Sequence, residues 1–278
     1  MKKREIIKRV LLIIFLVVLI GFGCYAYKAC FNLGNYDESQ IKDNHKMYFN
    51  IGKSNYIEEN YERYIAYRKL HNDYTDEQII TYVNIGLDNE FYTNMIDTDM
   101  NDGRLIICNK YHKLKSDYVP DLVSLNGYGG GKMEREAAEY FKKMSDEAKK
   151  DGLKIQNVSG YRSYWDQDYI YKNYVSRDGQ AKADTYSARA GTSEHQTGLA
   201  TDINSVSSKF ENTKEFKWLS ENAYKYGFIL RYPKGKEHIT GYMYEPWHYR
   251  YVGIDVANII HEMDITFDEY YATYILKG

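Results

Sequence analysis

Two segments far apart in the chain hold the residues whose types and spacing could do chemistry. The first is SEHQTGLATD, with His195 and Asp202, and the second is EPWH, with Glu245 and His248. Two imidazoles and one carboxylate form a ligand set suited to Zn²⁺, and a catalytic zinc keeps its fourth position for water. Zinc lowers the pKa of that water to about 7, and a nearby carboxylate can accept its proton as the water attacks a carbonyl. We interpret the two histidines and the aspartate as metal ligands and Glu245 as the general base.

The sequence around these residues indicates a loop at the first segment and requires a bend in the second. Isolated histidines are usually structural or solvated, so the residue types alone do not establish metal binding. SEHQTGLATD is polar, contains Gly198 and lacks strong periodicity, which is typical of a site loop. Positions 245 and 248 differ by an odd number, so a regular strand would place them on opposite faces. Because Pro246 removes a backbone donor, we expect the chain to bend at 245–247.

The elements that must position these residues mix helices and strands without regular alternation. Apolar residues at helical spacing predict a helix that begins at Glu134 and ends near Gly152. Further helices are expected over 166–175, over 212–227 and as a pair at the C-terminal end, with strands at 104–108, 153–159, 228–233 and 247–252. In the last strand the side chains alternate between two faces: Trp247, Tyr249 and Tyr251 against His248, Arg250 and Val252. This pattern favours an α+β domain, which we place over residues 131–278.

The charge distribution indicates a membrane segment rather than a nucleic-acid binder. The net charge is −2 over 278 residues, which argues against an obligate nucleic-acid partner. Residues 1–9 contain five Lys or Arg against one Glu, and the 18 residues from Val10 to Tyr27 carry no charge. A helix of that length spans about 27 Å, close to the hydrocarbon thickness of a bilayer. We expect a cytoplasmic basic flank at 1–9 and a single transmembrane anchor at 10–27, with the catalytic domain outside the cell.

Two alternatives to the uncleaved anchor stay open. A cleaved signal peptide is one, although the apolar run is long for it and no A-x-A site follows. A lipoprotein signal at Cys24 is the other, although Gly21 and Phe22 fit poorly before a lipidated cysteine. Beyond the anchor, residues 28–55 are polar and are interpreted as a stalk. Residues 56–130 are interpreted as a helical N-terminal extension of the domain.

Three motifs, in order along the chain, resemble those of one known family. They are SGYRS (159–163), SEHQTGLATDIN (193–204) and EPWHYRYVG (245–253), and they resemble the VanY-type D-alanyl-D-alanine carboxypeptidases of zinc peptidase family M15B. The similarity covers about residues 56–270. It implies a central antiparallel sheet flanked by helices, as in the hedgehog signalling domain. It also implies Zn²⁺ as cofactor and peptidoglycan stem peptides as substrate, from which the terminal D-alanine is removed.

The resemblance also implies roles for individual residues. The zinc ligands and the general base fall on the positions already named: His195, Asp202, His248 and Glu245. Arg162 of the GYRS motif would stabilise the developing oxyanion or bind the substrate carboxylate, for which arginine offers a bidentate fork. Gln167 and Ser193 would lie in the substrate pocket.

Three other functions remain as alternatives. An L,D-carboxypeptidase acting on tetrapeptide stems would differ in pocket size, which the sequence does not show. A non-catalytic protein could keep the metal and bind the cell wall. A serine enzyme of the penicillin-binding type would use Ser39 and Lys42, but these lie in the expected stalk and no K-T-G follows.

Overall fold

The computed structural model describes residues 49–277. The predictions for the basic flank, the anchor and residues 28–48 of the stalk therefore lie outside the described residues. Within 49–277, no helix combines the length and the apolar character needed to cross a membrane. The compact unit that begins at Ile51 contains all the elements that follow.

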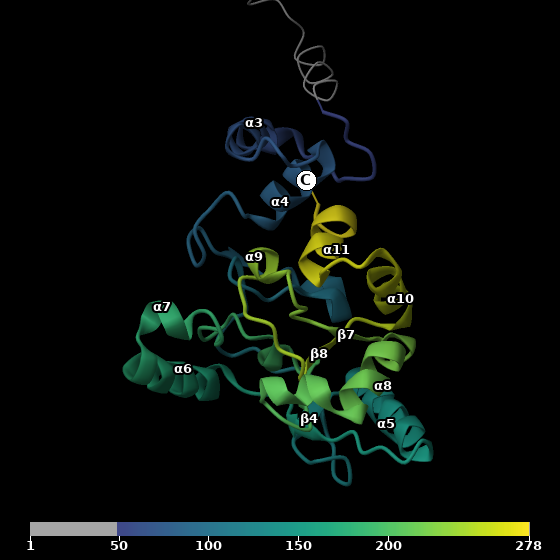
Figure 1. Ribbon diagram of the computed structural model, residues 1–278. Helices are drawn as coiled ribbons and strands as arrows, with labels where there is room; N and C mark the ends of the chain where they lie inside the picture. The colour runs from purple at the N-terminus through teal and green to yellow at the C-terminus, as the bar shows by residue number, and fades with distance from the viewer. Residues whose placement is uncertain (1–48, 278) are drawn as a thin grey trace, which may run out of the picture. The chain divides into compact units, whose positions relative to one another are not determined.

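A four-stranded antiparallel sheet carries the fold of this unit (Figure 1). Its order is β5-β6-β8-β7, and every neighbouring pair is antiparallel. The strands are β5 (Asn157–Ser159), β6 (Ala200–Ile203), β7 (Phe228–Leu230) and β8 (His248–Tyr251). The mixed helix-and-sheet class and the antiparallel pairing are thus confirmed, as are strands within three of the four predicted segments.

Alternation along the strands separates a core face from a second, polar face. Tyr249 and Tyr251 are each 1% exposed and pack in the main core, with Phe228 of β7. That core includes residues of α5 (Arg135–Lys150) and α8 (Lys214–Asn222), which lie next to each other in Figure 1. His248 and Arg250 point to the opposite face of the sheet. The predicted alternation is confirmed over His248–Tyr251.

Helices surround the sheet, and several begin at capping residues. After α5 come α6 (Tyr164–Asp178), α7 (Gln180–Ala183), α9 (Glu237–Thr240), α10 (Ile254–Met263) and α11 (Phe267–Tyr274). Short 3₁₀ helices are η4 (Glu194–Thr197), η5 (Ser208–Asn212) and η6 (Ala223–Tyr226). The helix predicted over 212–227 is therefore α8 flanked by η5 and η6. Capping boxes start α6 at Ser163 and α11 at Thr266.

The segment before the sheet is helical first and irregular afterwards. It begins with η2 (Glu58–Asn60), α3 (Tyr61–Leu70) and α4 (Asp76–Ile85). Short elements then follow: β1 (Ile96–Asp97), η3 (Met100–Leu105), β2 (His112–Lys113), β3 (Leu122–Ser124) and β4 (Lys132–Glu134).

The strand predicted at 104–108 is wrong. The chain there leaves η3 and forms no ladder with another strand. Its carbonyls instead accept from side chains: Nη2 of Arg250 donates to Arg104 O and Ile106 O, each at 2.9 Å. Oγ1 of Thr98 donates to Ile107 O at 2.7 Å. These side-chain donors replace the backbone partners that a strand would need.

The buried His112 predicts a loss of stability in acid. Burial lowers the pKa of His112 to about 4, whereas an unfolded histidine titrates near pH 6.5. The unfolded chain therefore binds more protons between these values, and the free energy of unfolding falls as pH drops through that range.

Replacing this histidine should flatten the acid dependence. From pH 7 to pH 5, the purified full-length protein should lose about 2 kcal/mol more unfolding free energy than His112→Leu. Urea denaturation followed by tryptophan fluorescence measures the free energy of unfolding of both proteins at each pH. Parallel pH profiles for the two proteins would contradict a neutral, buried His112.

Candidate active site

Strand register brings the two distant chemical segments together. β6 and β8 pair so that Asp202 lies directly opposite His248. Side chains of opposite residues share one face of the sheet and lie about 5 Å apart at Cβ. β5 places Ser159 beside Asp202 in the same way. Backbone pairing thus aligns Ser159, Asp202 and His248 in one row across three strands.

His195 reaches the same place from η4, just before β6. The turn ends at Gly198, whose φ of +69° favours glycine. A Cβ at Gly198 would also lie 2.8 Å from the backbone nitrogen of Glu134, so no larger residue fits. Nδ1 of His195 donates to Gly160 O at 2.7 Å. This bond orients the ring, and Nε2 then lies 3.4 Å from Oδ2 of Asp202.

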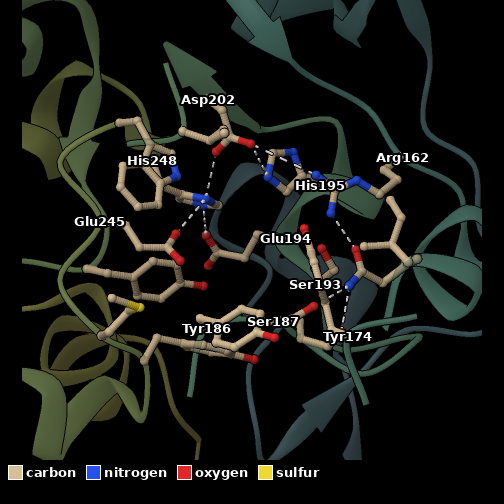
Figure 2. A pocket seen from close by; sticks show the side chains of 18 of the residues that line it. Arg162, Tyr174, Tyr186, Ser187, Ser193, Glu194, His195, Asp202, Glu245 and His248 are labelled. Atoms are coloured by element: carbon tan, nitrogen blue, oxygen red, sulfur yellow. Dashed lines mark hydrogen bonds and ion pairs between the residues drawn. The ribbon is translucent and has the colours of Figure 1, made fainter. Parts of the chain in front are cut away.

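The three proposed ligands converge as the sequence predicts. One ligand atom from each of His195, Asp202 and His248 lies within 4.8 Å of the others, and Figure 2 shows Asp202 beside both imidazoles. Oδ1 of Asp202 is buried and has no hydrogen-bond partner among residues 49–277. Burial raises the pKa of Asp202, but the two histidines outweigh it and hold that pKa below its usual range. A charged carboxylate with a free oxygen and two imidazoles fit the donor set that zinc takes.

Glu245 lies beside these ligands because the chain bends before β8. The backbone nitrogen of His248 donates to Glu245 O at 3.1 Å, which closes the turn expected at 245–247. Oε2 of Glu245 then lies 3.6 Å from Nδ1 of His248. Burial raises the pKa of Glu245 to about 8, although His248 and Arg162 act in the other direction. A bound cation would bring that pKa back down, so this carboxyl is suited to accept and return a proton near neutral pH.

Arg162 is held in place by fixed acceptors. Its Nη1 donates to Oε1 of Gln167 at 2.6 Å and its Nη2 to Oγ of Ser159 at 2.9 Å. Nη2 is also 3.9 Å from Oδ2 of Asp202. Gln167 is 1% exposed, and its Nε2 donates to Ala188 O at 2.6 Å. Gln167 therefore fixes the arginine from within the pocket wall.

One cavity of about 450 Å³ joins all these groups. The seven residues predicted from the sequence line it: Arg162, Gln167, Ser193, His195, Asp202, Glu245 and His248. Four tyrosines also line the cavity, and the sequence did not identify which ones they would be: Tyr174, Tyr186, Tyr232 and Tyr242. Tyr232 packs against the ring of His248, with centroids 4.8 Å apart. Figure 2 shows Tyr174 and Tyr186 across the cavity from the metal-ligand cluster.

Sequence reasoning missed a buried ion-pair cluster behind the ligands. Glu194 is 1% exposed and pairs with Arg231 at 2.7 Å and with Arg250 at 3.0 Å. Burial raises the pKa of Glu194, but the two arginines outweigh it and keep the carboxyl charged. The sequence offered one indication, since each arginine interrupts an otherwise largely apolar strand segment. A charge in such a place must find a partner.

Several known proteins are similar in sequence to this chain. Residues 130–254 match the VanY family, described as D-alanyl-D-alanine carboxypeptidase. The putative carboxypeptidase YodJ of Bacillus subtilis is 47% identical over 181 residues, which are 60% of this chain and 66% of that protein. A D-alanyl-D-alanine carboxypeptidase of Enterococcus faecalis is 37% identical over 184 residues, 63% of this chain and 68% of that protein. The chain thus spans about two thirds of the length of these relatives.

Solved structures extend the similarity to the fold. The LdcB LD-carboxypeptidase, studied for peptidoglycan recognition, is 41% identical with a TM-score of 0.62, covering 66% of this chain and 94% of that one. A variant of the D,D-pentapeptidase VanY from a VanB-type resistance cassette, solved in complex with Zn(II), is 36% identical with a TM-score of 0.54. That match covers 60% of this chain and 98% of the other. Sequence, fold and site agree, and the chain belongs to the VanY family of D-alanyl-D-alanine carboxypeptidases, within the M15 zinc peptidases.

Proposed function

We propose that this protein is a zinc-dependent D,D-carboxypeptidase that removes the C-terminal D-alanine from peptidoglycan stem peptides. The observation that carries this proposal is the convergence of His195, Asp202 and His248 within 4.8 Å. Glu245 and Arg162 line the same cavity. The Enterococcus faecalis relative, named as a D-alanyl-D-alanine carboxypeptidase, and the VanY structure with Zn(II) support the substrate and the metal.

Each residue of the site has a distinct task in this reaction. Zinc held by His195, Asp202 and His248 would act as a Lewis acid that polarises the scissile carbonyl and lowers the pKa of water. Oε2 of Glu245 accepts a proton from the water that attacks the scissile carbonyl. It returns the proton to the amine nitrogen as the C–N bond breaks and D-alanine leaves. Arg162 uses two of its five N–H donors on Gln167 and Ser159. Among residues 49–277 its side chain makes no other hydrogen bond, so the remaining donors can bind the terminal carboxylate of the substrate, which fixes the scissile bond over the ligand cluster.

Zinc removal and loss of Glu245 should each stop the reaction. We expect a chelator to abolish D-alanine release from pentapeptide muropeptides and added Zn²⁺ to restore it. Glu245→Gln should keep its zinc and lower kcat by about 10²- to 10⁴-fold, the usual worth of a positioned acid–base. Glu221→Gln, on the exposed side of α8, is the matched control. Activity that survives chelation, or a Glu245→Gln protein as fast as wild type, would contradict the proposal.

The same assay decides between D,D and L,D cleavage. LdcB is an LD-carboxypeptidase, and it shares 41% identity with this chain, so tetrapeptide stems must be tested beside pentapeptide stems. Mass spectrometry of purified muropeptides should show loss of D-alanine from the pentapeptide and an intact tetrapeptide. Cleavage of the tetrapeptide alone would assign L,D specificity instead.

Gln167 should affect substrate binding through Arg162. Gln167→Leu removes a charge-assisted acceptor of the guanidinium, so KM for a peptide ending in D-Ala-D-Ala should rise about tenfold. The zinc content should stay unchanged. Asp168→Asn, which alters an exposed ion pair with Lys172 on the same helix, is the control. A KM for Gln167→Leu equal to that of wild type would show that Arg162 needs no such support.

We also propose that the protein is a single-pass membrane protein with its catalytic domain outside the cell. The basic residues 1–9 and the uncharged run 10–27 support this proposal. Full-length protein should stay in the membrane fraction after an alkaline carbonate wash, whereas a chain that begins at residue 28 should not. External protease should reach the domain in cells stripped of their wall. Recovery of the full-length chain in the soluble fraction would rule the anchor out.

A further inference from the structure

His248 presents its two ring nitrogens to different surroundings. Nδ1 lies 3.3 Å from Oδ1 of Asp202 and 3.6 Å from Oε2 of Glu245, so it faces the ligand cluster. Nε2 points away from that cluster and lies 3.7 Å from Oε2 of Glu194, as a dashed line marks in Figure 2. Across residues 49–277, neither this nitrogen nor this oxygen has a hydrogen-bond partner, and both are buried. Two unpartnered polar atoms thus face each other behind the site.

Glu194 uses its two carboxylate oxygens differently. Oε1 accepts from Nε of Arg231 at 2.7 Å and from Nη1 of Arg250 at 3.0 Å. The side chain is 0% exposed, so bulk water does not reach it. The two hydrogen bonds from arginines to one oxygen are charge-assisted and strong, so they fix the carboxylate. Oε2 is left to accept from the imidazole in front of it.

The two arginines are fixed in turn by partners outside the cavity. Arg231 donates to both oxygens of Asp268, at 2.6 Å and 3.3 Å, and Nδ2 of Asn109 donates to the same carboxylate at 2.8 Å. Arg250 donates to two backbone carbonyls of segment 104–106. Two arginines and two carboxylates balance in charge, as buried ionic groups require. The carboxylate that faces the imidazole therefore has a defined position.

Metal binding through Nδ1 would give Nε2 a defined role. A neutral imidazole carries one proton, so a histidine that binds metal through Nδ1 carries that proton on Nε2. A buried N–H needs an acceptor, and such an acceptor fixes both the tautomer and the ring orientation of a ligand histidine. His195 has its acceptor in Gly160 O. For His248 the facing acceptor is Oε2 of Glu194, and a shift of about 0.7 Å brings the pair to hydrogen-bond distance.

We propose that Glu194 is a positioning residue for His248: its Oε2 accepts a hydrogen bond from Nε2–H and so keeps Nδ1 directed at the metal. The proposal rests on the zinc site of the proposed function. It assigns the buried cluster behind the site a role in metal affinity as well as in folding. Glu194 acts through the histidine and touches neither the metal nor the scissile bond.

Zinc affinity of the full-length protein, measured by competition with a fluorescent chelator, tests the proposal. Glu194→Gln should bind zinc about 10- to 100-fold more weakly, since one amide oxygen cannot serve both the arginines and the imidazole. Ser145→Ala is the control because it removes a buried hydrogen bond, from Oγ to Ile155 O at 2.8 Å, that takes no part in fixing Glu194 or its two arginines. That control should lower stability and leave zinc affinity unchanged. Wild-type affinity in folded Glu194→Gln, or an equal loss in Ser145→Ala, would overturn the proposal.

A spectroscopic readout separates positioning from general stability. In the zinc-loaded, ¹⁵N-histidine-labelled protein, the Nε2 proton of His248 should resist exchange with solvent, and Glu194→Gln should remove that protection. If Glu194→Gln does not fold, Glu194→Asp decides: it keeps the charge beside Arg231 but draws the free oxygen away from the imidazole. The expected result is again weaker zinc binding, and unchanged binding by the aspartate variant would overturn the proposal.

These outcomes are distinct from a failure of the proposed function. Zinc competition needs no substrate, so a wild-type protein that binds zinc but releases no D-alanine would sink the carboxypeptidase assignment and leave the test of Glu194 intact. If the wild-type protein cleaves stem peptides and the Glu194→Gln variant binds zinc as tightly as wild type, only the positioning role is contradicted.

Discussion

The pairing of β6 with β8 is the constraint on which the site depends. It places Asp202 opposite His248, and it turns Tyr249 and Tyr251 into the core on the other face. A slip of one residue would send one of the two ligands into that core and a tyrosine into the cavity. The hydrophobic pattern of β8 therefore protects the register, because burying its aromatic residues and aligning the ligands require the same pairing.

The polar face of the sheet holds several buried carboxylates close together, and their charges must be balanced. Asp202, Glu245 and Glu194 are all buried within a few ångströms of His248. Three carboxylates in such surroundings repel one another unless cations are close. Arg162 faces Asp202, and the two buried arginines hold Glu194. Asp202 and Glu245 remain for the metal and the transferred proton.

Segments outside the residues that match the family model contribute to this arrangement. Asp268 of α11 and Asn109 lie outside residues 130–254, and they hold Arg231 in place. The carbonyls of segment 104–106 hold Arg250. The chain before the sheet thus packs into the back of the site, and it is part of the folded unit that positions the ligands.

The sequence predicted local features well and long-range ones only in part. Periodicity located α5 and β8, the helix expected over 166–175 lies within α6, and the odd spacing of 245 and 248 correctly required a bend. The strand at 104–108 failed because its partners are side chains of Arg250 and Thr98, which no local pattern encodes. Glu194 was missed for the same reason: its importance lies in its pairing with Arg231 and Arg250, which are distant in the sequence. Gln167 was assigned to the pocket, but its bonds to Arg162 and Ala188 appear only in three dimensions.

The central claim is that His195, Asp202 and His248 hold one zinc ion. Crystals of the zinc-loaded protein, measured on both sides of the zinc absorption edge, test it most directly. The account predicts a single anomalous peak about 2.0–2.2 Å from Nε2 of His195, a carboxylate oxygen of Asp202 and Nδ1 of His248. An anomalous peak at another position would contradict the claim. So would a zinc-loaded crystal in which these three side chains do not contact the metal.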